Sequence, residues 1–188
     1  MTFSNTLNSD ATVTPRTLTL AAGSGNITFS EAVGNAAPLS IFTIKSAGTV
    51  IANKTIAAAS FNFTGNTLTL NNVLNTSGGV TITNSGLFTT AADGDITATG
   101  GFSQTGVGSN QLAGDITTTN NSISFATPIV LTGDIALASG NGAMTFSNTL
   151  NSDATATPRK LTLTAGNENI TFSEAVGNAA PLVALTIQ

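Results

Sequence analysis

A long internal repeat constrains this chain more than any other feature of its sequence. Residues 1–44 align without a gap with residues 144–187, and 36 of the 44 positions are identical. Because a repeat is one structural unit that packs against its neighbours, it predicts a repetitive architecture. We therefore divide the chain into one full repeat, residues 1–143, and the start of the next copy, residues 144–188. Met1 aligns with the interior residue Met144, so we expect a window cut from a longer tandem array.

A shorter period lies inside the long repeat. The words Gly94-Asp95-Ile96, Gly114-Asp115-Ile116 and Gly133-Asp134-Ile135 recur at spacings of 20 and 19. A unit of about 20 residues matches one coil of a solenoid. At that length, the full repeat of residues 1–143 would contain about seven coils.

Short alternating words predict strands throughout the chain. In Leu18-Thr19-Leu20, Val80-Thr81-Ile82 and Leu161-Thr162-Leu163, every second residue is aliphatic, so one face is apolar and the other carries Thr. Strands of three to five residues are too short for independent hairpins, but they can stack in register. We predict an all-β chain folded as a right-handed parallel β-helix (β-solenoid) with about 20 residues per coil. Antiparallel β-sandwich repeats are the alternative, because they also show short alternating strands.

Composition excludes several classes of function. Five basic residues are too few for a phosphate-neutralising patch, so we expect no nucleic acid partner. The chain has no His and no Cys, which rules out Ser/His/Asp and Cys/His catalysis within it, and no carboxylate pair suggests a glycosidase. It is therefore not expected to be an enzyme or to need a cofactor. No run of about 18 apolar residues is present, so we expect no membrane insertion.

The aspartates of the short period are the candidate metal ligands. If one period equals one coil, Asp95, Asp115 and Asp134 would stack about 4.8 Å apart. Bound Ca²⁺ would relieve the repulsion between such carboxylates. The alternative is that each aspartate bonds the backbone of its own turn and points into water.

Repeated Thr-x-Thr words raise an ice-binding alternative. Examples are Thr67-Leu68-Thr69, Thr81-Ile82-Thr83 and Thr97-Ala98-Thr99, which could form a flat hydroxyl array on one side of a solenoid. Half-buried strands produce the same words, because Thr favours strands and alternation places it outward.

Two stretches resemble a known family. Residues 18–44 and 161–187 carry the frame LTLxAGxxNITFxxAVGxxxPL, and residues 131–146 read LTGDIALASGNGAMTF. Together these words resemble the β-strand repeats of giant filamentous haemagglutinin-like bacterial surface proteins. The resemblance implies right-handed β-helical shafts, export to the cell surface, and roles in adhesion, aggregation or biofilm structure. It brings no catalytic residues.

We therefore expect a structural segment of an extracellular or cell-surface fibre: the repetitive shaft of a filament, sheath or adhesin. The expected partners are further repeats or further copies of the chain, which associate into a filament. The alternative is an adhesive module that recognises glycans or other cells, and ice binding is a minor alternative.

Overall fold

The short motifs in which apolar residues alternate with polar ones form strands, as their pattern predicts. The computed structural model describes residues 1–188 and contains strands and turns but no helix. The strands stack into a parallel β-solenoid of about eight turns, with about 21 residues per coil. Because every strand pairing is parallel, the predicted β-helix is confirmed and the antiparallel sandwich is wrong. No part of the chain forms a helix long and apolar enough to cross a membrane.

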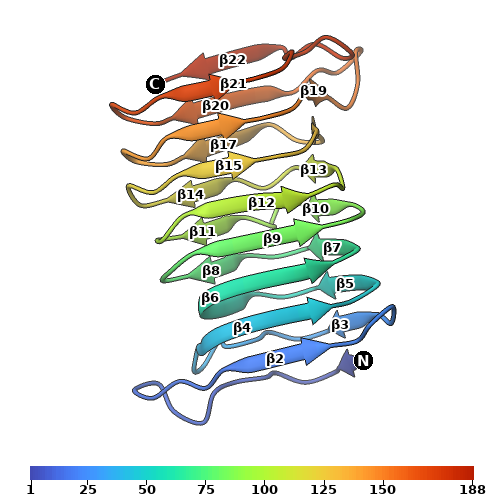
Figure 1. Cartoon of the computed structure of the whole chain (residues 1–188), viewed down its shortest axis with the longest axis vertical. Coiled ribbons are helices and arrows are strands. Elements are labelled where there is room, and N and C mark those ends of the chain that lie inside the picture. The colour runs from blue at the N-terminus through green and yellow to red at the C-terminus, as the bar shows by residue number, and fades with distance from the viewer.

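The strands follow one another at short intervals along the whole chain (Figure 1). They are β1 Thr2–Phe3, β2 Leu18–Ala21, β3 Ile27–Phe29, β4 Leu39–Ser46, β5 Thr49–Ala52, β6 Ile56–Gly65, β7 Thr67–Leu70, β8 Leu74–Thr76, β9 Val80–Asn84, β10 Phe88–Thr90, β11 Ile96–Ala98, β12 Phe102–Gly106, β13 Asn110–Leu112, β14 Ile116–Thr118, β15 Ile123–Phe125, β16 Ile129–Leu131, β17 Ile135–Ala138, β18 Met144–Phe146, β19 Leu150–Ser152, β20 Lys160–Thr164, β21 Ile170–Phe172 and β22 Ala184–Ile187.

The coils have three faces. Face A is the eight-stranded sheet β1-β3-β5-β7-β10-β13-β16-β19. Face B consists of β2, β4, the second half of β6, and β9, β12, β15, β18 and β21. Face C consists of the first half of β6 and β8, β11, β14, β17, β20 and β22. Faces B and C form one sheet because β6 bends from one face to the other and pairs with both β8 and β9.

Each coil visits face A, then face C, then face B. In Figure 1 the chain rises from the N-terminus at the bottom, with the front strands running to the right and the rear strands to the left. This is the right-handed sense, as predicted. Coil length varies: the coil that leads from Thr2 to its partner Thr28 is longer than the coil that leads from Ile51 to its partner Thr69. The segments between paired strands take up most of the difference, and the β2–β4 pairing also shifts register between Leu20 and Ala21.

One hydrophobic core runs the length of the solenoid. It contains 37 buried residues, and the inward side chains of successive strands stack into columns. On face B, Phe102, Phe125, Phe146 and Phe172 form one such column, with ring centroids 5.0, 6.1 and 4.9 Å apart. The core therefore has no break at the boundary between the first repeat and the second.

The two copies of the repeat lie on different faces. The first copy places Thr2–Phe3 (β1) on face A, whereas the second places Met144–Phe146 (β18) on face B. Likewise Leu18–Ala21 (β2) lies on face B, and its equivalent in β20 lies on face C. The repeat therefore advances six coils and two further faces, which is close to the about seven coils that the short period predicts.

Candidate functional site

The first two candidate calcium ligands do stack. Ile96 pairs with Ile116, so Asp95 and Asp115 occupy the same place in consecutive coils. Oδ1 of Asp95 accepts a hydrogen bond from the backbone N–H of Asp115 at 2.8 Å. In the same way, Oδ1 of Asp115 accepts one from the N–H of Ala136 at 2.7 Å. Each carboxylate thus joins its own coil to the next one, rather than bonding its own turn as the alternative proposed.

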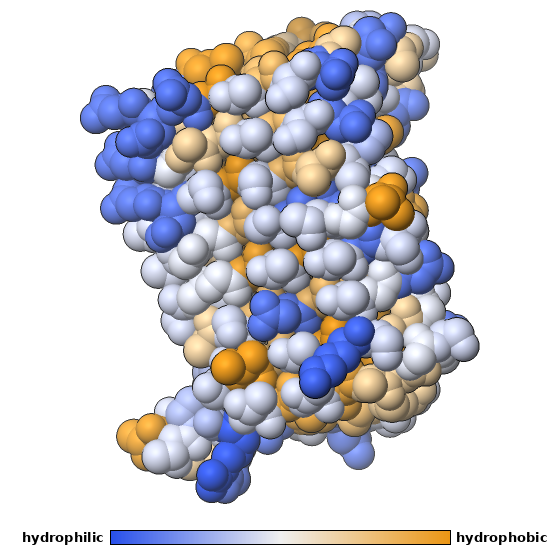
Figure 2. Space-filling model, in the orientation of Figure 1, coloured by the Kyte–Doolittle hydropathy of each residue, from blue (hydrophilic) through white to orange (hydrophobic).

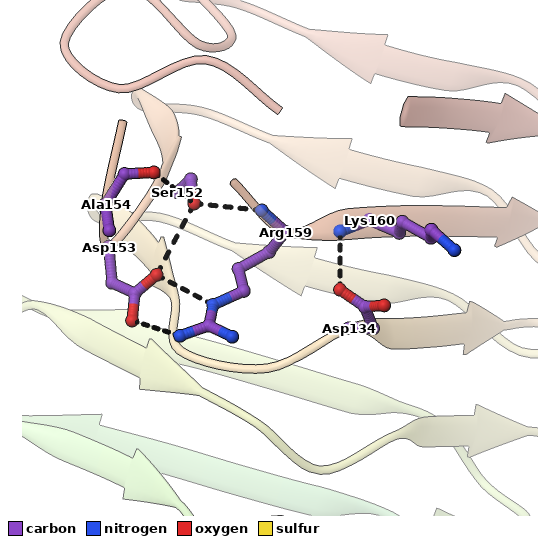
Figure 3. A network of polar contacts seen from close by, with 6 residues as sticks. All are labelled: Asp134, Ser152, Asp153, Ala154, Arg159 and Lys160. Atoms are coloured by element: carbon purple, nitrogen blue, oxygen red, sulfur yellow. Dashed lines mark hydrogen bonds and ion pairs between the residues drawn. The ribbon is translucent and has the colours of Figure 1, made fainter. Parts of the chain in front are cut away.

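The third candidate lies out of this column. Ile116 pairs with Leu137 and not with Ile135, so the coil that contains Asp134 is displaced by two residues. Oδ1 of Asp134 accepts a hydrogen bond from the backbone N–H of Lys160 at 2.9 Å (Figure 3). No three His, Cys, Asp or Glu side chains gather closely enough to hold a metal ion. Calcium binding at these aspartates stays a prediction.

A clasped loop is the main polar feature of the second copy. The clasped loop is residues 8–17 in the first copy and the equivalent residues 151–160 in the second, which include the end of β19 and the start of β20. Asp153 and Arg159 form a two-pronged ion pair, with Nε to Oδ1 and Nη2 to Oδ2 both at 2.8 Å (Figure 3). The Ser152 hydroxyl oxygen accepts the N–H of Arg159 at 3.0 Å. The hydrogen bond from Arg159 lowers the pKa of Asp153, and the pKa of Arg159 is raised in turn.

The first copy builds the same clasp. Nε of Arg16 bonds Oδ1 of Asp10 at 2.8 Å, and Oγ of Ser9 accepts the N–H of Arg16 at 2.9 Å. The Arg16 and Asp10 side chains are 65% and 61% exposed, against 31% and 27% for Arg159 and Asp153. Sequence reasoning missed the clasp. The signal was the same Ser-Asp and Arg, at the same spacing, in both copies.

Buried amides interrupt the core midway along the chain. Asn84, Gln104 and Asn110 are almost fully buried. Nε2 of Gln104 donates to Oδ1 of Asn84 at 2.6 Å, and Oε1 of Gln104 accepts from the Thr127 hydroxyl at 3.0 Å. Oδ1 of Asn110 has no partner. The alternation in Val80–Asn84 and Phe102–Gly106 already points Asn84 and Gln104 inward, and this was the signal available in the sequence.

The Thr-x-Thr words do not share a surface. Thr67–Thr69 lies on face A, Thr81–Thr83 on face B, and Thr97–Thr99 begins on face C. Face B nevertheless carries an unbroken outward column of small polar side chains, which Figure 2 shows as a largely pale surface. Its members in coil order are Thr19, Thr43, Asn62, Thr81, Ser103, Ser124, Thr145 and Thr171. The ice-binding prediction depends on this column and stays a prediction.

A groove follows the corner between faces B and A. Its volume is about 580 Å³, and its lining includes Lys45, Thr64, Asn66, Thr83 and Val107. Glycines from four coils are among the residues that line it. Of the 14 residues that line the groove, only two are hydrophobic, and the others include asparagine, serine, threonine and lysine.

No protein-family model, no curated protein and no solved structure matches this chain. The parallel β-solenoid of about eight turns is consistent with a β-helix repeat protein. The resemblance to filamentous haemagglutinin-like repeats therefore rests on the sequence words.

Proposed function

We propose that the chain is a structural shaft segment of an extracellular or cell-surface fibre of bacterial type. The observation that supports this most directly is the hydrophobic core, which passes from the first repeat into the second without a break. In the last coil, Leu185 and Ile187 of β22 pair with the fully buried Leu161 and Leu163, so they continue the inward columns. They are nevertheless 41% and 58% exposed.

Another coil placed on this end would bury both side chains and pair the free edges of β21 and β22. Open edges and exposed apolar side chains both favour association with a matching strand. The partners are further repeats of the same chain or further copies of it. Head-to-tail addition of that kind gives an open filament rather than a closed ring. The location outside the cell rests on the resemblance to filamentous haemagglutinin-like surface proteins.

Electron microscopy of the purified chain at rising concentration tests this role. Filaments of uniform width, formed without any ligand, are the expected result. An Ile187→Asp substitution places a charge on the open core end and should abolish them. Val107→Asp is the matched control, since Val107 is 84% exposed on the side of the solenoid and should leave filaments intact. Monomers at every concentration, or equal assembly of both variants, would contradict the proposal.

An adhesive role is the second candidate, and the groove between faces B and A favours it. Its side-chain amides and hydroxyls are groups that hydrogen-bond sugar hydroxyls, and Lys45 and Asn66 stand on neighbouring coils. Glycan-array binding that is lost in the Asn66→Ala variant would support this candidate. Binding that survives this change would exclude the groove as its site.

A further inference from the structure

We infer that each long repeat is rotated about the solenoid axis relative to the repeat before it. The chain passes two faces beyond six whole coils, and on a three-faced solenoid this equals a rotation by one face against the direction of winding. The inference rests on the proposed function, because it describes how repeats follow one another in a shaft. Three repeats, or about twenty coils, then bring the same residues back to the same side. The fibre is a threefold screw built from a sequence that repeats directly.

The order of strands on face A gives the size of the step. From β1, six successive neighbours on that face lead to β16. The chain then crosses face C as β17 and reaches face B as β18, whose sequence is that of β1. With ~4.8 Å between neighbouring strands, the step is roughly 32 Å along the axis.

Every word of the repeat moves in the same direction. Leu7 bridges to Val33 on face C, whereas its equivalent Leu150 lies in β19 on face A. Ile27–Phe29 (β3) lies on face A, and its equivalent Ile170–Phe172 (β21) lies on face B. A local shift of register would displace one strand, but here each motif that can be compared is displaced by one face.

The rotation between repeats is tolerated because all three faces require the same sequence pattern, in which apolar residues alternate with polar ones. The word apolar-Thr-Phe has both apolar residues buried in β3 on face A and again in β18 on face B. The bonds local to the repeat are also kept. Oδ1 of Asn8 accepts the N–H of Ala36 at 3.0 Å, and Oδ1 of Asn151 accepts the N–H of Ala179 at 2.9 Å.

The rotation between repeats determines at which corner of the solenoid the clasped loop of each repeat lies. In the first copy the clasped loop leaves the corner between faces C and B, at the lower left of Figure 1. In the second copy it leaves the corner between faces A and C. The next repeat presents it at the remaining corner, so a lateral partner that contacts this loop meets the fibre on three sides in turn.

Engineered cysteine pairs test the rotation of the second repeat relative to the first, because the chain contains no Cys of its own. Outward neighbours on adjacent parallel strands fall within the Cα separation that a disulfide requires. Ser124 pairs with Thr145, and Ala136 pairs with Thr162. We therefore expect intramolecular disulfides in S124C/T145C and in A136C/T162C.

The control variants pair residues that would be neighbours only if the second copy lay on the same faces as the first. In that case Thr145 would lie on face A above Val130, and Thr162 would lie on face B above Ser124. The controls are therefore V130C/T145C and S124C/T162C, and we expect at least tenfold slower monomer cross-linking in each. Rapid cross-linking of the controls, or failure of both expected pairs to cross-link, would contradict the rotation between repeats. If the expected pairs cross-link but the chain forms no filaments, the rotation between repeats is supported and the shaft role is contradicted.

Discussion

The two copies of the segment that begins each repeat differ in what surrounds them, although their sequences barely differ. Both close an Asp–Arg clasp and both tie an asparagine to the turn of the next coil. The first copy, however, has its clasp in open solvent at the end of the solenoid, while the second rests on residues 123–138. Comparing equivalent residues therefore separates the effects of local sequence from those of a neighbouring coil.

The sequence therefore specifies separately which residues form a strand and on which face that strand lies. The alternation of apolar residues with Thr decides that a word forms a strand, and either copy satisfies it. The face is decided by the number of residues between words, which sets how far the chain has wound. Sequence identity between repeats therefore does not imply that equivalent residues lie above one another.

The largest expected difference between the copies concerns their equivalent phenylalanines. Phe146 is 1% exposed and lies between two other rings, whereas Phe3 is half-buried and contacts the ring of Phe29 alone. We expect Phe146→Ala to cost about 3–5 kcal/mol of unfolding free energy, as for other buried phenylalanines. Phe3→Ala should cost distinctly less. Urea denaturation followed by circular dichroism measures both, and equal losses would show that the first coil packs as tightly as the inner ones.

A smaller difference is expected for two equivalent glycines. Gly34 and Gly177 have φ of +74° and +72°, so alanine is strained at either position, at about 1–3 kcal/mol. Only at Gly34 would the added Cβ lie 2.0 Å from a backbone oxygen, that of Ala57 in the coil above. At Gly177 the nearest atom is 3.2 Å away.

Gly34→Ala should therefore lower the melting temperature more than Gly177→Ala does. The matched pair isolates contact with the next coil, because the backbone strain is the same in both. If the two variants melt together, the coil above yields to the methyl group, and stacking is looser than the distances indicate.

The smallest difference is expected for the clasps. The hydrogen bond from arginine lowers the pKa of Asp10 and of Asp153. A carboxyl with a lower pKa in the folded chain adds stability above its unfolded pKa, and this is lost as the pH falls through the folded pKa. Arg159→Gln should therefore lower the melting temperature at pH 7 and have no effect well below pH ~3.9.

Arg16→Gln should have a weaker effect at pH 7, because the exposed pair in the first copy is better screened by solvent. Thermal melts of both variants at neutral and acid pH make the comparison. A loss that persists at acid pH would assign the role of Arg159 to packing of its side chain instead of its charge.

The sequence predicted the parallel solenoid because alternation and turn residues act locally and recur. It did not predict which face each word occupies, because coils of unequal length accumulate small differences that no single word reveals. The same effect separated Asp134 from Asp95 and Asp115: all three share a word, but a two-residue shift moved the third. The buried Gln104 and the Asp–Arg clasps were visible as patterns, yet their partners come from other turns or from the far side of a loop.

The direction of the backbone hydrogen bonds has a mechanical consequence. Strands lie across the solenoid and pair with the coils above and below, so these bonds point along its length. A pull on the two ends therefore loads a few bonds at a time at the outermost coil and peels it from the stack. Each coil so released adds a chain of about 21 residues, or roughly 70 Å of extended length, while the coils beneath stay folded.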